Sequence, residues 1–209
     1  MMKVAIIDYN MGNLHSVGRA VSHVAPAGTR VEITTDPDII RHADRVVFPG
    51  QGAARDCMRE LETRGMADVV REVAQTKPFL GICMGMQVLM EHSEENNGIA
   101  CLGLYQGQVR YFGRAHRERL KIPQMGWNQV WQKTNHPLWA GIADGARFYF
   151  VHSYYVDPVD KHLVTGETDY GIRYAAALAR DNVFAMQAHP EKSSADGLKL
   201  LENFMRWEP

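Results

Sequence analysis

Cys83 has the neighbours that a nucleophilic cysteine needs. It lies in the heptapeptide GICMGMQ (81–87), directly after the apolar pair Phe79-Leu80, and a glycine stands two positions to either side of it. This spacing is typical of a nucleophile elbow, in which a strand turns sharply into a helix and the turn residue projects outward. The helix is expected to continue through 88–90, and its N-terminal N–H groups would favour the thiolate. A buried structural thiol is the alternative.

A cysteine nucleophile needs a base, and the base needs an orienting group. Candidates for both lie in QAHPEK (187–192), which follows an apolar strand pattern. His189 would accept the thiol proton and return it to the leaving group, while Glu191 would hold the imidazole ring. In extended backbone these two side chains share one face, and Pro190 stiffens that geometry. A surface turn with unrelated charges is the alternative.

The segment PGQG (49–52) supplies a third part of such a site. Gly50 and Gly52 enclose Gln51, so backbone N–H groups are free to face a ligand. Together with the N–H of Met84 they could form an oxyanion hole. A plain turn is the alternative.

The first half of the chain alternates apolar strand patterns with helical patterns. Strands are expected at 3–9, 31–34, 45–48 and 79–82, and helices at 13–25, with Asn13 as N-cap, and at 53–76, with a break at Gly65. This alternation predicts an α/β fold with a doubly wound, mostly parallel central sheet flanked by helices. In such sheets a site lies outside the carboxyl ends of the strands, so Asn13, Gly52 and Cys83 are expected near one another.

The second half predicts added antiparallel strands, because aromatic residues cluster or alternate there. Strands are expected at 108–112, 129–131 and 147–151, and a hairpin joins 175–179 to 183–187 through Asp181-Asn182. Ser193 and Asp196 resemble a capping box before a final helix that ends at Trp207. Since no linker or repeat is evident, residues 1–209 are expected to form a single domain.

Composition excludes several classes of protein. The chain has 209 residues, of which 45% are hydrophobic and 22% charged, and its net charge of −1 without a basic cluster argues against nucleic-acid binding. No apolar segment is long enough to span a membrane and no signal peptide is evident. Three cysteines suit a reducing cytoplasm better than a disulfide framework. Neither they nor the nine histidines have metal-ligand spacing, so no metal is expected.

The three motifs, in this order and over essentially the whole chain, resemble the class I (triad) glutamine amidotransferase family. The resemblance implies that Cys83 attacks the side-chain amide of glutamine, with His189 and Glu191 completing the triad, and that a γ-glutamyl thioester is then hydrolysed to glutamate. It also implies that Gly50, Gln51, Gly52 and Met84 stabilise the oxyanion and that no cofactor takes part.

Four further segments resemble the branch of this family that provides the glutaminase subunit of imidazole glycerol phosphate synthase. They are DYNMGN (8–13), IPQMGWN (122–128), YFVHSY (149–154) and HPEKS (189–193). Gln124 departs from the histidine usual at its position, which puts any role of that imidazole in doubt. This resemblance implies a role in histidine biosynthesis as a heterodimer with a separate (β/α)8-barrel cyclase. That partner combines the ammonia with the intermediate PRFAR to give imidazole glycerol phosphate and AICAR. A (β/α)8 barrel needs about 250 residues, so this chain is too short to contain the cyclase as a second domain.

The same resemblance assigns further residues. The substrate glutamine is expected to bind Gln87, Glu95 and the backbone of Ser153 and Tyr154, and the partner is expected to contact Asn13, Trp127, Tyr149 and Lys192. Judged without the family, Glu95 is a solvated charge, Gln87 a helix-surface amide, Trp127 a core residue and Lys192 a solvated lysine, while Cys57 and Cys101 are packing thiols.

Two other functions remain open from the sequence. One is the glutaminase subunit of another class I amidotransferase, such as the anthranilate-synthase type. The other is a non-catalytic binding module on the same fold with an inert Cys83. The presence of all three triad residues favours an active enzyme.

Overall fold

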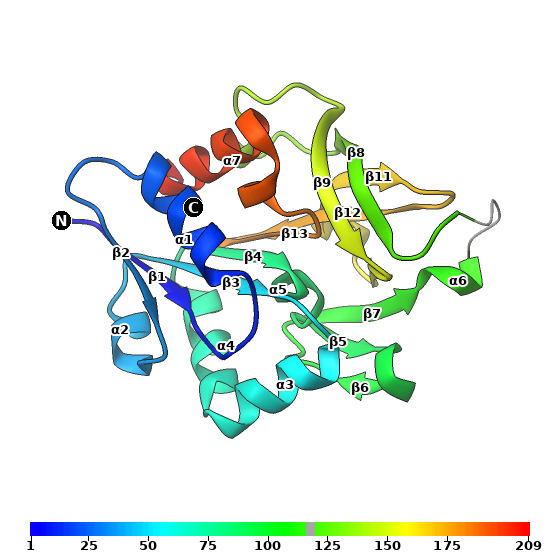
Figure 1. Cartoon of the computed structure of the whole chain (residues 1–209), viewed down its shortest axis with the longest axis horizontal. Helices are drawn as coiled ribbons and strands as arrows, with labels where there is room; N and C mark the ends of the chain where they lie inside the picture. Colours follow the sequence, from blue (N-terminus) through cyan, green and yellow to red (C-terminus); the bar gives the residue numbers. More distant parts are fainter. Residues whose placement is uncertain (116–119) are drawn as a thin grey trace.

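The computed structural model describes residues 1–115 and 120–209, and five neighbouring parallel strands form its centre (Figure 1). In spatial order these strands are β2 (Arg30–Thr34), β1 (Lys3–Ile7), β3 (Arg45–Gly50), β4 (Phe79–Cys83) and β13 (Val183–Met186). Because the strands are parallel, their carboxyl ends meet along one edge of the sheet. That edge carries Gly50, Cys83 and the residues that follow Met186.

Helices cover both faces of this sheet. One face packs against α1 (Leu14–Val24) and α7 (Ser194–Arg206), and the other against α2 (Pro37–Arg41), α3 (Ala54–Thr63) and α4 (Met66–Thr76). Side chains alternate along β1, so Ile6 lies in the core under α1 and α7 while Ile7 lies in the core under α2 to α4. Burial on both faces explains the unbroken apolar runs of the strands.

Antiparallel strands extend the sheet beyond β13. They follow in the order β12 (Arg173–Arg180), β10 (Tyr154–Pro158), β7 (Tyr105–Tyr111), β5 (Met90–Ser93) and β6 (Ile99–Ala100), with β5 and β7 parallel to each other. A second ribbon branches from β12 through β11 (Val164–Asp169) to β8 (Gln124–Gln132) and β9 (Ala146–His152). The short helices are α5 (Met84–Gln87), α6 (Phe112–Ala115) and the 3-10 turns η1 (Glu95–Asn97), η2 (Pro137–Trp139), η3 (Lys161–Leu163) and η4 (Pro190–Lys192).

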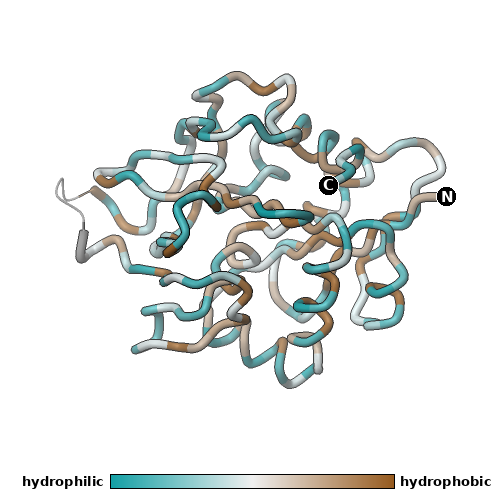
Figure 2. Tube along the Cα trace, turned by 180° about the vertical axis from the view of Figure 1, so that it is seen from behind, coloured by the Kyte–Doolittle hydropathy of each residue, from teal (hydrophilic) through white to brown (hydrophobic). Residues whose placement is uncertain are grey.

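Hydrophobic segments gather towards the middle of the molecule, as the hydropathy colouring in Figure 2 shows. Within residues 1–115 and 120–209, no helix is both long and apolar enough to cross a membrane.

The predicted doubly wound sheet with added antiparallel strands is confirmed, whereas some local predictions are wrong. The expected helix at 88–90 is absent from the described chain, since α5 ends at Gln87 and β5 begins at Met90. The expected capping box does not form either, because the Ser193 hydroxyl donates to the His189 carbonyl oxygen at 2.6 Å instead of capping α7. Asn13 is the N-cap of α1, but its side chain makes no capping hydrogen bond within the described structure.

The turn between β4 and α5 lies directly against β3. Cys83 has φ 55° and ψ −110°, a conformation that L-residues rarely adopt. A Cβ atom on Gly85 would lie 1.9 Å from the Phe48 carbonyl oxygen, and one on Gly81 would lie 2.8 Å from the Gly85 carbonyl oxygen. The two glycines of the elbow are therefore required by backbone packing, and they hold Cys83 at the edge of the sheet.

Gly85→Ala is expected to destabilise the fold by about 1–3 kcal/mol, because the new methyl group meets a backbone oxygen that cannot rotate away. The midpoint of urea unfolding measures this loss. Gly18→Ala in α1 is the matched control. Its Cβ would lie 3.1 Å from the flexible Cδ1 of Ile33, and alanine favours the helix. Equal midpoints for the two variants would show that the elbow does not depend on this approach.

Candidate active site

His189 lies beside Cys83 because of the pairing between β13 and β4. Met186 is in register with Ile82, so the segment after β13 emerges next to the cysteine. The Nδ1 atom of His189 lies 2.8 Å from Oε1 of Glu191, and both side chains are almost fully buried. The geometry is not the extended backbone expected from the sequence, because Pro190 begins the 3-10 turn η4. The turn still brings the imidazole and the carboxylate together.

The electrostatic surroundings of His189 favour the imidazolium. Burial by itself lowers the pKa of His189, but Cys83 and Glu191 outweigh it and raise the pKa to about 10. The Nε2 atom is buried and has no hydrogen-bond partner among the described residues. Since Glu191 occupies Nδ1, Nε2 is the atom left to exchange a proton with the sulfur or with a ligand.

Most of the residues singled out in the sequence line one cavity of about 280 Å³ at this edge of the sheet. The site residues expected from the sequence that line it are Gln51, Gly52, Cys83, Met84, Gln87, Glu95, Ser153, Tyr154 and His189. Pro123, Val151 and His152 complete the lining and are not among the expected site residues. Gly50 does not line the cavity. It lies beneath it, where a Cβ would come within 2.3 Å of the Tyr9 hydroxyl.

Glu95 reaches the cavity from η1 and is partly buried. Burial raises the pKa of Glu95. The backbone N–H of Ala54 donates a hydrogen bond to Glu95 Oε2 at 2.7 Å, and this bond acts to lower the pKa. Glu95 is thus not the fully solvated charge that its sequence neighbours suggest. It joins the start of α3 to the wall of the cavity.

Two buried glutamines connect the cavity wall to the cysteine. Nε2 of Gln87 donates to the Tyr154 carbonyl oxygen at 3.1 Å and to Oε1 of Gln187 at 2.9 Å. Nε2 of Gln187 lies 3.7 Å from the Cys83 sulfur. Oε1 of Gln87 is buried and has no partner in the described structure. Gln187 is a site residue that the motifs do not predict, although its place after β13, two residues before His189, is a signal in the sequence.

Gln124 is buried and follows Pro123, which lines the cavity. Its Oε1 lies 2.6 Å from the Tyr174 hydroxyl, which lies 3.0 Å from Nε2 of His152. The other ring nitrogen, Nδ1 of His152, contacts the Tyr154 carbonyl oxygen at 2.6 Å. Burial lowers the pKa of His152 to about 4, so the ring is neutral at pH 7 and Nδ1 carries its proton towards the carbonyl. The amide of Gln124 therefore contacts the Tyr174 hydroxyl, whose single hydrogen can be donated either to Gln124 Oε1 or to His152 Nε2.

An apolar surface includes β9, the strand that also carries the cavity residues Val151 and His152. Trp127 on β8 is 48% exposed and pairs across the ribbon with Tyr149 on β9, with ring centroids 6.2 Å apart. The ammonium group of Lys192 lies 6.0 Å from the Tyr149 ring. Asn13 precedes α1 and follows Gly12, where a Cβ would be 3.5 Å from Gly50 Cα.

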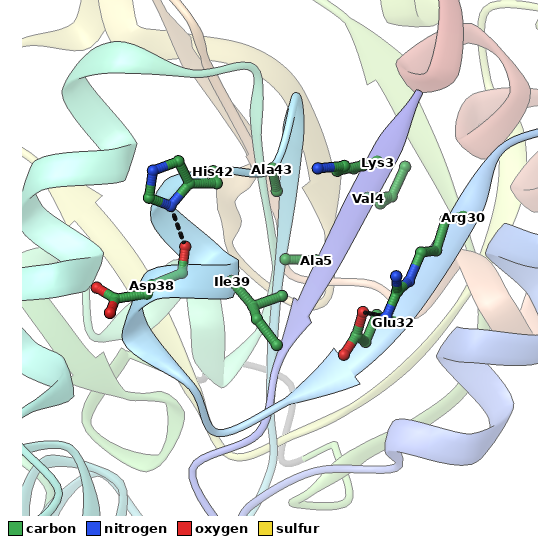
Figure 3. A pocket seen from close by; sticks show the side chains of 9 residues that line it. All are labelled: Lys3, Val4, Ala5, Arg30, Glu32, Asp38, Ile39, His42 and Ala43. Carbon is green, nitrogen blue, oxygen red and sulfur yellow. Dashed lines mark hydrogen bonds and ion pairs between the residues drawn. The ribbon is translucent and has the colours of Figure 1, made fainter. Parts of the chain in front are cut away.

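A second cavity, of about 190 Å³, lies near the amino ends of the strands, between β1, β2 and α2 (Figure 3). The side chains of Arg30 and His42 in its lining have partners. Arg30 Nη2 lies 2.7 Å from Glu32 Oε2, and His42 Nδ1 lies 2.7 Å from the Asp38 carbonyl oxygen. No cysteine, serine or threonine is among the described residues that line it. Across residues 1–115 and 120–209, no cluster of His, Cys, Asp or Glu is arranged to hold a metal ion.

The fold and the site define an α/β protein that carries a Cys–His–Glu arrangement at the carboxyl edge of its sheet. The family model for class I glutamine amidotransferases matches residues 5–207. The chain belongs to that family, and the resemblance inferred from the motifs is confirmed.

Several proteins are similar to this chain over its full length. The imidazole glycerol phosphate synthase subunit HisH of Pseudomonas putida is 57% identical over 211 residues, covering 100% of this chain and 99% of the relative. The subunit of the same name from Aromatoleum aromaticum is 56% identical over 214 residues, with both chains covered completely. Among solved structures, PurLQS from Thermotoga maritima has a TM-score of 0.73 at 17% identity, covering 98% of each chain. This last likeness shows the fold.

Cys83→Ala is expected to lower the pKa of His189 from about 10, because one of the two groups that raise it is removed. NMR titration of the imidazole measures the shift, and Cys101→Ala is the control. Since the folded pKa exceeds the value of about 6.5 in unfolded chains, the stabilisation by His189 is fully present below pH 6.5 and is lost as the pH rises to about 10. That loss should be smaller in Cys83→Ala. An unchanged titration would contradict the coupling.

Proposed function

We propose that this chain is the glutaminase subunit of imidazole glycerol phosphate synthase, with residues 1–209 acting as one amidotransferase domain. It hydrolyses glutamine to glutamate and ammonia and delivers the ammonia to a separate cyclase subunit in histidine biosynthesis. One observation carries the proposal: Cys83 on its strained turn shares a cavity with His189, which is ion-paired to Glu191. Full-length similarity to HisH subunits supports the choice of synthase.

In the first half of the reaction the Cys83 sulfur attacks the γ-carbonyl carbon of glutamine. A C–S bond forms, and the carbonyl oxygen becomes an oxyanion. His189, protonated at Nε2, gives its proton to the amide nitrogen as the C–N bond breaks, and ammonia leaves. Glu191 keeps the ring oriented through Nδ1 and stabilises the imidazolium.

In the second half the γ-glutamyl thioester on Cys83 is hydrolysed. Neutral His189 removes a proton from water, the resulting hydroxide adds to the thioester carbon, and a second oxyanion forms. The C–S bond then breaks, which releases glutamate and returns the sulfur and His189 to their starting state.

The oxyanion of both steps would be stabilised by backbone N–H groups of Gln51, Gly52 and Met84, which line the cavity, while Gly50, which does not line it, starts the turn that presents them. Gly50 is in register with Cys83 across β3 and β4, and Gly52 lines the cavity with φ 92°, a backbone conformation that glycine adopts without strain. Met84 directly follows the cysteine.

The substrate glutamine would be held by Gln87, Glu95, Ser153 and Tyr154. Oε1 of Gln87 is a buried acceptor without a partner in the described chain, and the Glu95 carboxylate lies in the same cavity. Two such acceptors suit the α-ammonium group of the substrate. Backbone N–H groups of Ser153 and Tyr154 are suited to its α-carboxylate.

The partner in this proposal is a (β/α)8-barrel cyclase that converts PRFAR to imidazole glycerol phosphate and AICAR. The apolar surface of Trp127 and Tyr149 with Lys192 is the candidate interface, and Asn13 is a further expected contact. We expect no cofactor, and a cytoplasmic location is supported by the three free cysteines.

Cys83→Ala should lower glutamine-dependent synthesis by the complex at least about a thousandfold, because no other group can form the thioester. Synthesis from added ammonium salt should persist, since it bypasses the cysteine. Formation of imidazole glycerol phosphate measures both. Cys101→Ala removes a buried thiol outside the cavity lining and should retain both activities. Glutamine-dependent turnover by Cys83→Ala would refute the proposal.

Trp127→Ala should weaken binding of the cyclase about tenfold or more, as expected for an exposed aromatic anchor. Isothermal titration calorimetry measures the dissociation constant. Trp131, on the same face of β8, is 45% exposed against 48% for Trp127, and lies about 13 Å further along the strand. Trp131→Ala is therefore a control matched in size and exposure, and a smaller effect is expected. Equal effects, or none, would place the interface elsewhere.

A further inference from the structure

The side chain of Gln187 joins the cysteine to Gln87 in the wall of the cavity. It is fully buried, follows β13, and contacts Gln87 through Oε1 and the Cys83 sulfur through Nε2. The proton-transfer scheme of Cys83, His189 and Glu191 gives it no task. A buried amide with both ends engaged by groups of the site is nevertheless held in one orientation.

That orientation follows from a backbone carbonyl. The Tyr154 carbonyl oxygen can only accept hydrogen bonds, so the Gln87 atom that lies 3.1 Å from it must be the amide nitrogen. The second hydrogen of this nitrogen then points to Gln187, whose nearest atom must be the amide oxygen. The nitrogen of Gln187 is consequently the atom that faces the Cys83 sulfur.

The reverse orientation is disfavoured at the same carbonyl. If the Gln87 amide were turned over, its oxygen would face the Tyr154 oxygen, and two acceptors would oppose each other in a buried place. The carbonyl itself is held by Nδ1 of neutral His152 at 2.6 Å, a second donor that comes from the opposite side of the network. The order of donors and acceptors is thus fixed from Tyr154 to the sulfur.

We propose that Gln187 is a positioning residue of this site, whose amide N–H holds the Cys83 sulfur as a hydrogen-bond acceptor while its amide oxygen aligns Gln87. A sulfur that faces a donor is stabilised more as thiolate than as thiol, because charged acceptors form the stronger hydrogen bonds. One side chain therefore couples the state of the nucleophile to the orientation of a substrate-binding amide. The effect on turnover rests on the proposed glutaminase function, whereas the effect on the sulfur does not.

The test compares alkylation of Cys83 by iodoacetamide in the full-length chain and in Gln187→Met, which keeps the length of the side chain but lacks the donor. At pH 7 the labelling rate is expected to fall about tenfold, and at pH 10, where an ordinary thiol is ionised, the two rates are expected to converge. Peptide mass spectrometry locates the label. Cys57 and Cys101 interfere little, because burial raises the pKa of each thiol to about 12.

Kinetics of glutamine hydrolysis in the complex give a second readout. Gln187→Met should lower kcat about tenfold, whereas Gln87→Met should act mainly by raising KM. Gln132→Met is the matched control. The Gln132 amide donates a hydrogen bond to the Ile142 carbonyl oxygen. Gln132 lies at the end of β8 opposite to Gln124, about 27 Å away along the strand. This variant should behave like the unaltered chain.

Wild-type labelling rates at pH 7 in Gln187→Met would overturn the proposal, and so would slow labelling at both pH values, which indicates altered access. Gln187→Leu replaces the methionine variant if that variant fails to fold. If the unaltered complex releases no glutamate, the proposed function fails, but the labelling comparison still decides the role of Gln187. If glutamate is released normally by Gln187→Met and labelling is unchanged, only the role of Gln187 fails.

Discussion

The close approach of the Cys83 turn to strand β3 determines the arrangement of everything around it. Gly85 lies so near the Phe48 carbonyl that no side chain fits between them, and Cys83 takes a strained conformation as a result. Because β4 lies between β3 and β13, the same turn is flanked by the glycine-rich segment on one side and by His189 on the other. The reactive geometry is therefore a property of the sheet as much as of the motif.

Burial gives this arrangement its electrostatic character. The imidazole of His189 and the carboxylate of Glu191 lie together in a nearly water-free place, where each compensates the desolvation of the other. The amides of Gln87 and Gln187 extend the same principle to neutral groups, with Tyr154 as the acceptor that orders them. These charged and polar groups form one connected set, in which Gln87 Oε1, His189 Nε2 and Glu191 Oε2 stay without a partner in the described structure.

Local motifs predicted the chemistry better than they predicted its surroundings. Gly-x-Cys-x-Gly and His-Pro-Glu require only short-range geometry, and the doubly wound sheet follows from strands that are apolar on both faces. The apolar run at 88–90 has a helical pattern, but Val88 and Leu89 form the turn that follows α5 and Met90 begins β5, a difference that periodicity in so short a run does not reveal. Ser193 does not cap α7 because the His189 carbonyl and the Tyr149 N–H engage its hydroxyl. The position of Gln187 depends on pairings between distant segments, which a single sequence does not encode in any local pattern.

The place of β13 in the sheet has a consequence for how the molecule is made. This strand occupies a central position between β4 and β12, although every other strand of the described sheet precedes it along the chain. Gln187 and Cys83 are accordingly 104 positions apart in sequence. During synthesis the ribosome completes the nucleophile's strand long before the strand that leads to the base. Until β13 is inserted, β4 has an unpaired edge and Cys83 has no imidazole beside it. The nascent chain therefore lacks the base of the proposed triad while its sheet is incomplete.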